Sequence, residues 1–153
     1  MALKKVLVYG TDGEIEQLQA GDYTREESYV GLINGEASAI IIGTPVYSSG
    51  ADTVKKCDKA AIATAKCVGL AVDSTIAAGI TGQFQIDGVF EATTAQWDAV
   101  AGTTGGLVPN ATYFLGASGL LTSVVPTTGI SAPIGTALSP TSLRVAIQRV
   151  IKL

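Results

Sequence analysis

Short runs of β-branched and aromatic residues recur along this chain, and most of them end at a turn that contains glycine. Val, Ile and Thr suit strands, whereas Gly with Asn, Asp or Ser marks the turns between them. Turns at such short intervals leave few segments long enough to form long helices. The pattern predicts an all-β chain, folded as a β-barrel or a β-sandwich of the β-tulip kind, with an extended N-terminal arm.

Particular segments carry this expectation. Asp12-Gly13 and Asn34-Gly35 favour tight turns with positive φ. A capped helix is expected at Thr93–Val100, beginning at Thr93 or Thr94, with a flexible loop at Gly102–Gly106 after it. The expected strands are Lys5–Tyr9, a fully buried Ala39–Ile42, Gln83–Ile86 with Phe84 and Ile86 on one face, Val89–Glu91 after an Asp87-Gly88 turn, the hairpin of Thr112–Leu115 with Leu120–Val125, and Leu143–Ile151, which also fits a helix.

Two stretches of the chain, 45–75 and 111–141, align on each other without a gap. Tyr47 meets Tyr113, and each stretch ends in an apolar strand with an internal glycine. The Ala- and Lys-rich stretch Asp52–Lys66 has helical propensity, but its counterpart contains Pro126 and Pro133, which break helices. We therefore expect this stretch to be extended, and we divide the chain into an arm at 1–38 and a β domain at 39–153 built from two weakly similar units.

Charge is scarce and unevenly distributed. The net charge is −3, which argues against nucleic-acid binding because that needs a basic face. Residues 1–38 hold seven acidic and three basic residues, whereas no charged residue stands between Asp98 and Arg144. This uncharged stretch forms either a very apolar core or a surface buried between subunits, and we favour the oligomer because large apolar patches mark association sites.

No targeting or membrane segment is expected. The apolar run Ala39–Ile42 is far shorter than the roughly 20 residues of a spanning helix. Lys4 and Lys5 are not followed by the long apolar region of a signal peptide. We expect a protein made in a host cytoplasm that does not bind a membrane.

Catalytic and cofactor motifs are not recognisable. Histidine is absent, which removes the commonest general base and zinc ligand. Gly102–Gly106 lacks the Gly-Lys-Ser/Thr of a phosphate-binding loop, and Gly116–Gly119 lacks the spacing of a nucleophile elbow. The carboxylates with a conceivable acid–base role are best interpreted as turn residues: Asp73, Asp87, Glu91 and Asp98. We expect a non-enzymatic protein with no cofactor and no metal.

The two cysteines, Cys57 and Cys67, match no metal-binding spacing. We interpret them as small buried hydrophobic residues. The alternative is a disulfide formed after release into an oxidising medium.

Several residue strings resemble structural proteins of tailed bacteriophages. The opening Lys4–Tyr9 with Asp12–Asp22 resembles the N-terminal arm of phage head and tail proteins. The rest is similar to capsid decoration (cement) and head-fibre proteins, although such proteins often have Gly where this chain has Asn110. The segments that carry this second likeness are Thr44–Tyr47, Val68–Ala71, Ala78–Gly79, Gly82, Gly88–Phe90, Gly106–Leu115, Gly119–Thr122 and Pro133–Ser139.

The resemblance implies an oligomeric virion protein that stabilises the capsid by clamping neighbouring capsomers. This protein would be a homotrimer bound to the major capsid protein on the capsid exterior. The residues expected at interfaces are Lys4, Lys5, Leu7, Tyr9, Trp97 and Tyr113. Three alternatives stay open. One is a head-fibre base, tail or receptor-facing module that binds host glycan through Trp97, Tyr113 and Phe114. The others are a cell-wall hydrolase and a β-sandwich interaction domain unrelated to viruses.

Overall fold

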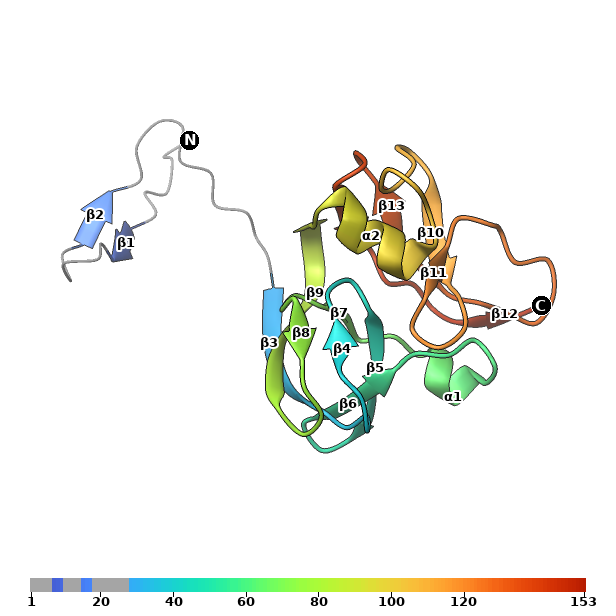
Figure 1. Cartoon of the computed structure of the whole chain (residues 1–153), viewed down its shortest axis with the longest axis horizontal. Coiled ribbons are helices and arrows are strands. Elements are labelled where there is room, and N and C mark those ends of the chain that lie inside the picture. The colour runs from blue at the N-terminus through green and yellow to red at the C-terminus, as the bar shows by residue number, and fades with distance from the viewer. Residues whose placement is uncertain (1–6, 10–14, 18–27) are drawn as a thin grey trace, which may run out of the picture.

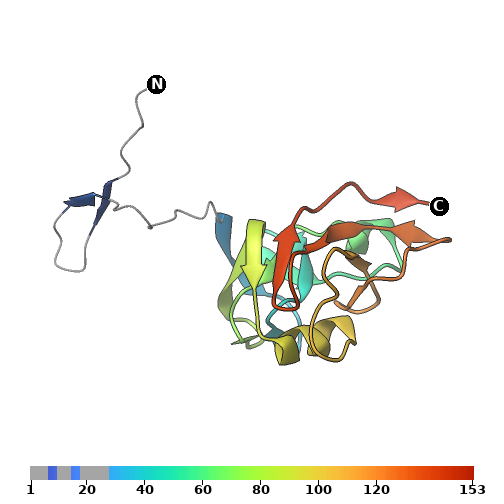
Figure 2. The same cartoon turned by 90° about the horizontal axis from the view of Figure 1, so that it is seen from above.

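The computed structural model describes residues 7–9, 15–17 and 28–153. Within these ranges the chain forms fifteen strands and two short helices, which confirms the all-β prediction. In Figures 1 and 2, α1, β12 and the C-terminus gather on the side of the body that lies away from β3. The predicted turn at Thr11–Gly13 and the residues Lys4 and Lys5 lie outside the described ranges.

The strands are short apart from one, and their bounds follow the order of the chain. They are β1 (Leu7–Tyr9), β2 (Ile15–Gln17), β3 (Ser28–Asn34), β4 (Ile40–Ile41), β5 (Pro45–Gly50), β6 (Thr53–Lys56), β7 (Gly69–Ala71), β8 (Thr75–Ile76), β9 (Thr81–Glu91), β10 (Thr112–Leu115), β11 (Leu121–Thr122), β12 (Ile130–Ser131), β13 (Pro133–Ala137), β14 (Ser142–Val145) and β15 (Ile151–Lys152), with helices α1 (Ile62–Ala65) and α2 (Thr94–Ala101).

Five strands form a ring of backbone pairing in the order β9-β3-β6-β5-β7, because β7 also pairs with β9. Only the β3–β6 pair is parallel. The β7–β9 pairing is brief, with Leu70 opposite Gln85 and Ala71 opposite Phe84. The choice between a barrel and a sandwich stays a prediction.

The ring contains its own apolar core. Val46, Val54, Ala71 and Phe84 come from β5, β6, β7 and β9, and side chains of β3 pack against them. The paired strands β4 and β8 add Ile40 and Ile76. Each ring strand alternates its side chains between two faces, so one face of each can supply this core.

The long strand β9 joins the ring to the second half of the molecule. Its first part pairs with β3, and its last part, from Gly88 to Glu91, pairs with β14. The predicted Asp87-Gly88 turn is therefore wrong: Gly88 has a φ of 91° but stays inside the strand. Glycine tolerates this conformation without ending the strand.

The prediction that Phe84 and Ile86 lie on one face of the strand is also wrong. Phe84 is buried, but Ile86 is 43% exposed. Tyr29 pairs with Gln85 while Ser28 pairs with Asp87, so Ile86 is the extra residue of a β-bulge. The bulge reverses the alternation and turns Ile86 outward.

The second half is an antiparallel sheet in the order β11-β10-β13-β14-β9. The predicted hairpin is confirmed in part: β10 pairs with β11 around Gly116–Gly119, but β11 covers Leu121–Thr122 rather than Leu120–Val125. The strand expected at Leu143–Ile151 is partly confirmed, because β14 covers Ser142–Val145 and the chain pairs again only at Ile151.

The helix α2 confirms the predicted capped helix. The Thr93 side chain accepts a hydrogen bond from the Gln96 backbone N–H, and the Gln96 side chain accepts one from the Thr93 N–H. This reciprocal pair is a capping box. Gly102 ends the helix in the left-handed conformation. The helix places Trp97 in the core. Its ring packs edge to face against Phe90, with the ring centroids 5.4 Å apart.

Three other local predictions need correction. Ala39–Ile42 is not a buried strand, since β4 covers two residues and only Ile40 is buried. Asn34 does not form a tight turn with positive φ; its buried side-chain amide donates to the carbonyls of Ser38 and Ile76 and so holds a longer loop. The Ala- and Lys-rich stretch is extended in β6, as expected, but then forms the single turn α1.

The two sequence units share a strand order: β6-β5-β7 in the first and β11-β10-β13 in the second. A Cβ on Gly69 would meet the Gln85 carbonyl oxygen at 2.9 Å, and one on Gly135 would overlap the Arg144 carbonyl oxygen. In each unit, then, the internal glycine lets a neighbouring strand approach closely. The residue registers differ between the units, and their origin as a repeat stays a prediction.

Candidate interaction surface

The described residues hold no cluster of metal-ligating side chains. Among them, no group of three or more His, Cys, Asp or Glu side chains is placed to hold a metal ion. Within the same ranges, no helix has the length and apolar character needed to cross a bilayer.

The predicted interface residues lie in different environments. Trp97 and Tyr113 are both 0% exposed. The Trp97 Nε1–H donates to the Thr141 carbonyl at 3.0 Å, and the Tyr113 hydroxyl accepts from the Val108 N–H at 3.0 Å. Both side chains are core residues, so the expectation that they contact a partner needs correction. A hydrophobic aromatic side chain whose polar atom finds an internal partner is stable in a core.

The arm residues of the same prediction are not tested. Lys4 and Lys5 lie outside the described residues. Leu7 and Tyr9 belong to β1, which pairs with β2, but their side chains are not among those that the structure describes.

The aromatic set expected for glycan stacking is also buried. Phe114, beside Tyr113 in β10, is 8% exposed. Trp97, Tyr113 and Phe114 thus form part of the interior rather than a groove, and they offer no face to a sugar ring.

Acidic side chains hold loops in place. The Asp98 carboxylate accepts hydrogen bonds from the N–H groups of Gly105 and Gly106 and from the Thr103 hydroxyl. The bond from Gly106 contributes most to lowering the pKa of Asp98. This network orders the glycine-rich loop after α2, where a flexible loop is expected from sequence.

Asp58 also holds loops in place, and its hydrogen bonds connect two segments of the chain. Its carboxylate accepts from the Ala60 N–H at 2.8 Å and from the Ser118 N–H at 3.1 Å. These bonds, led by the one from Ala60, lower the pKa of Asp58. The side chain thereby ties the loop before α1 to the β10–β11 hairpin.

The two cysteines are neighbours in space and carry free thiols. Cys57 is buried and Cys67 is half-buried, close to the prediction of two small buried residues. A hydrogen bond with the Cys67 side chain, followed by burial, raises the pKa of the Cys57 thiol. Both effects favour the neutral thiol of Cys57 over the thiolate, which is the reactive form.

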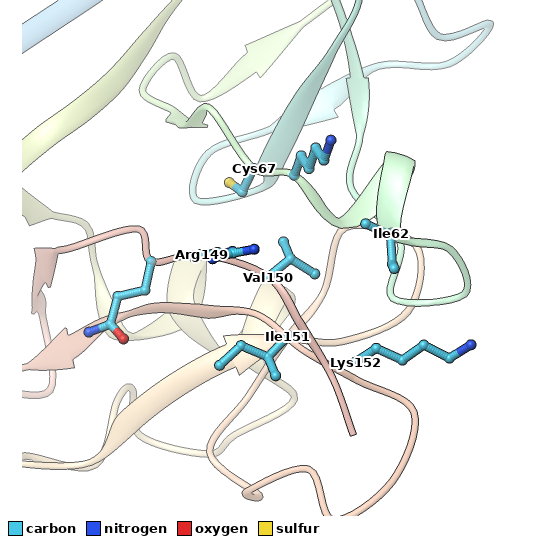
Figure 3. Close-up of a pocket in the computed structure, with 8 residues that line it drawn as sticks. Ile62, Cys67, Arg149, Val150, Ile151 and Lys152 are labelled. Atoms are coloured by element: carbon cyan, nitrogen blue, oxygen red, sulfur yellow. The ribbon is translucent and has the colours of Figure 1, made fainter.

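A cleft of about 810 Å³ lies between α1 and the C-terminal segment. In Figure 3, Ile62 of α1 stands on one wall, and Val150, Ile151 and Lys152 stand on the other. Lys66, Arg149 and Lys152 supply three positive charges, and none of the described residues that line the cleft is acidic. We call it the basic cleft.

A second hollow of about 550 Å³ lies beside it, lined mainly by residues 124–130 and by Asp58–Ala60. Val124 and Val125 on its rim are 73% and 64% exposed. Ile130 lines this hollow and pairs with Lys152 of the basic cleft through the β12–β15 ladder. The two hollows therefore flank one set of elements, which we call the α1–β12–β15 end (Figure 1).

The uncharged stretch contributes to both the core and this surface. Leu107, Leu115 and Ile134 are buried, so much of the missing charge reflects an apolar interior. Val124 and Val125 account for the exposed part at the α1–β12–β15 end. No sequence signal singled out this end, because its residues are separated in the chain and become neighbours only through folding.

Comparison with known proteins gives no family: no family model and no curated protein sequence matches the chain.

Proposed function

We propose that this chain is a structural, non-enzymatic protein of a tailed-phage particle that binds the outer capsid surface as a homotrimer. Its sequence resemblance to phage decoration proteins supports the choice of particle. The observation that carries the proposal is the apolar surface of the α1–β12–β15 end, where Val124 and Val125 are the most exposed large hydrophobic residues described. Adjacent exposed apolar side chains of this kind mark association sites.

Physical reasoning favours such a role for a fold of this type. Packaged DNA pushes a capsid outward, and extra subunits that clamp neighbouring capsomers oppose that pressure. A clamp needs buried apolar area and stable loops rather than reactive groups. The hydrogen bonds of Asp58 hold the loop beside the exposed valines in place, which lowers the entropy lost on binding.

Other virion roles have less support. A receptor-facing module that binds glycan would need exposed aromatic side chains, and its expected platform of Trp97, Tyr113 and Phe114 is buried. Capsid decoration therefore remains the function that the exposed valines favour.

The direct test is binding to expanded capsid shells of a phage whose genome encodes this chain. Val124→Asp with Val125→Asp places two charges at the α1–β12–β15 end, and we expect capsid occupancy in co-sedimentation to fall at least about tenfold. Val108→Asp with Leu138→Asp is the matched control, since both side chains are 54% exposed and neither lines a hollow. Equal occupancy for the two double variants, or no binding by the unaltered chain, would reject the proposal.

Self-association is tested separately by light scattering on a gel-filtration peak. Each chain has a mass of 15.6 kDa, so a trimer and a monomer are easily distinguished. A trimer supports the proposal. A monomer at all concentrations rejects the homotrimer in solution. The co-sedimentation test then decides whether the chain assembles on the capsid shell.

A further inference from the structure

We propose that the basic cleft binds the acidic N-terminal segment, residues 12–22, of a second copy of this chain. The proposal deepens the self-association part of the proposed function and rests on it. It concerns contact between copies and can be tested without a capsid.

The cleft has the chemistry of a site for an acidic, partly apolar peptide. Lys66, Arg149 and Lys152 are exposed and line it together. Between them, Ile62 and Ile151 supply exposed apolar surface. A concave surface that carries charge of one sign concentrates the field and favours ligands of the opposite sign. The apolar side chains add a contact that salt does not screen.

The segment 12–22 has the complementary composition. It contains Asp12, Glu14, Glu16 and Asp22 and no basic residue, together with the apolar Ile15 and Leu18. No other stretch of equal length in this chain carries as much uncompensated negative charge. Part of it, Ile15–Gln17, is the strand β2. An extended chain directs successive side chains to opposite faces, so it can present carboxylates and apolar groups at once.

The edges of β2 and β15 provide a second way to join the acidic segment to the basic cleft. Within the described residues, β2 pairs only with β1, and β15 pairs only with β12. Each therefore has an edge without a described strand beside it. An extended peptide often binds by adding a strand to such an edge. Pairing of β2 with β15 would bring Glu16 and Lys152 into the same two-strand ladder.

The arrangement favours a second copy over the same chain. The strand β3 begins at Ser28, on the side of the body away from α1 and β15 (Figures 1 and 2). The chain from Gln17 to Ser28 covers eleven residue-to-residue steps and spans at most about 40 Å when fully extended. The cleft of the same chain lies on the opposite side of the body from Ser28, whereas the cleft of a neighbouring copy can lie beside the segment.

The first test identifies the contact and the chain that supplies it. Full-length protein labelled with ¹⁵N is mixed with unlabelled protein and treated with a carbodiimide, which joins carboxylates to amines in direct contact. We expect cross-links from Glu14 or Glu16 to Lys66 or Lys152, with many of them joining a labelled to an unlabelled peptide. Cross-links that never mix labels would place the segment in its own cleft. Absence of these cross-links would show that the acidic segment does not occupy the cleft. Either result overturns the proposal.

The second test uses charge reversal. Lys66→Glu with Lys152→Glu should weaken self-association about tenfold, measured by sedimentation equilibrium. Adding Glu14→Lys with Glu16→Lys to the same chain should restore most of the loss. Lys55→Glu, an exposed lysine on β6 outside the cleft, is the control. Circular dichroism spectra confirm that each variant is folded. Failure of the restoring substitutions would reject the contact, whatever the capsid assay shows.

Discussion

At the scale of single residues, the role of Trp97 depends on the contacts that its ring and its Nε1–H make. Trp97 is the only tryptophan, and both a core and an interface position suit its size. The structure places it against Phe90 with its Nε1–H bonded to Thr141. Whether Trp97 lies in the core or at an interface depends on β14 and the Thr141 carbonyl, which are distant from Trp97 in the chain. No local pattern could have shown that α2 turns this side chain inward.

Trp97 should therefore affect the stability of the single chain. Trp97→Ala removes a buried side chain and is expected to lower the free energy of unfolding by about 3–5 kcal/mol. Trp97→Phe keeps much of the volume but leaves the Thr141 carbonyl without its donor, and should cost about 1–3 kcal/mol. Urea unfolding followed by circular dichroism measures both. A fully stable Trp97→Ala protein that no longer self-associates would instead restore the interface interpretation.

Asp98 gives a prediction about pH. Hydrogen bonds from Gly106, Thr103 and Gly105 hold the pKa of its carboxyl below its usual value in the folded chain. A carboxylate with a lowered folded-state pKa adds stability above its unfolded pKa of about 3.9, and this stability is lost as pH falls through the folded-state pKa. Asp98→Asn should thus be less stable than the unaltered chain at pH about 6, and the difference should shrink below pH about 3.5.

The measurement is the urea midpoint as a function of pH. Asp52→Asn removes one exposed charge without altering the loop after α2, and it serves as the control. A constant difference between Asp98→Asn and the unaltered chain at every pH would mean that the carboxylate charge is not what orders the loop.

At the scale of elements, the cap, the hairpin and the strand class follow from local chemistry. Thr93 with Gln96 predicts the start of α2, and the glycines at 116 and 119 predict the β10–β11 turn. The errors occur where tertiary pairing overrides a local signal. Asp87-Gly88 has the composition of a turn, yet β14 pairs directly with this part of β9 and keeps it extended. A local turn preference is weak beside several ladder hydrogen bonds.

The internal glycine of β13 supports a prediction at this scale. A methyl group on Gly135 would overlap the Arg144 carbonyl oxygen in the paired strand β14. Backbone cannot move aside as a flexible side chain can, so Gly135→Ala should lower the free energy of unfolding by about 1–3 kcal/mol or more. Gly50→Ala is the matched control, because nothing lies within 4 Å of its added methyl group.

Thermal unfolding of the two variants measures this difference. We expect a clear fall in the midpoint for Gly135→Ala and little change for Gly50→Ala. Equal midpoints would contradict the close approach of β13 and β14. The internal glycine is visible in the sequence, but its reason is not, since it depends on the strand that pairs beside it.

At the scale of the whole molecule, composition predicts a β protein but not how its surface is divided. The uncharged stretch supplies buried residues such as Leu115 and Ile134 as well as the exposed Val124 and Val125. Hydropathy does not distinguish these two uses. The α1–β12–β15 end brings together residues near positions 60, 125 and 150, and only the folded chain makes them one surface.

The whole molecule also predicts cooperative unfolding. The strand β9 takes part in both the ring and the second sheet, and Leu70 of the ring strand β7 packs in the core that surrounds Trp97. The two cores therefore share elements and should unfold together. Phe84→Leu, a change in the ring core, is expected to lower the free energy of unfolding by about 1–3 kcal/mol.

Native-state hydrogen exchange tests whether the two cores unfold together. If the cores unfold as one unit, Phe84→Leu should lower the protection of amides in β13 by the same free energy as those in β3. Ile134→Val, which alters the other core, should reduce protection in β3 to the same degree as in β13. Loss confined to the half that carries the substitution would mean that β9 connects two independent units. The α1–β12–β15 end could then open without disturbing the ring, because its residues belong to the second half and to the segment around α1.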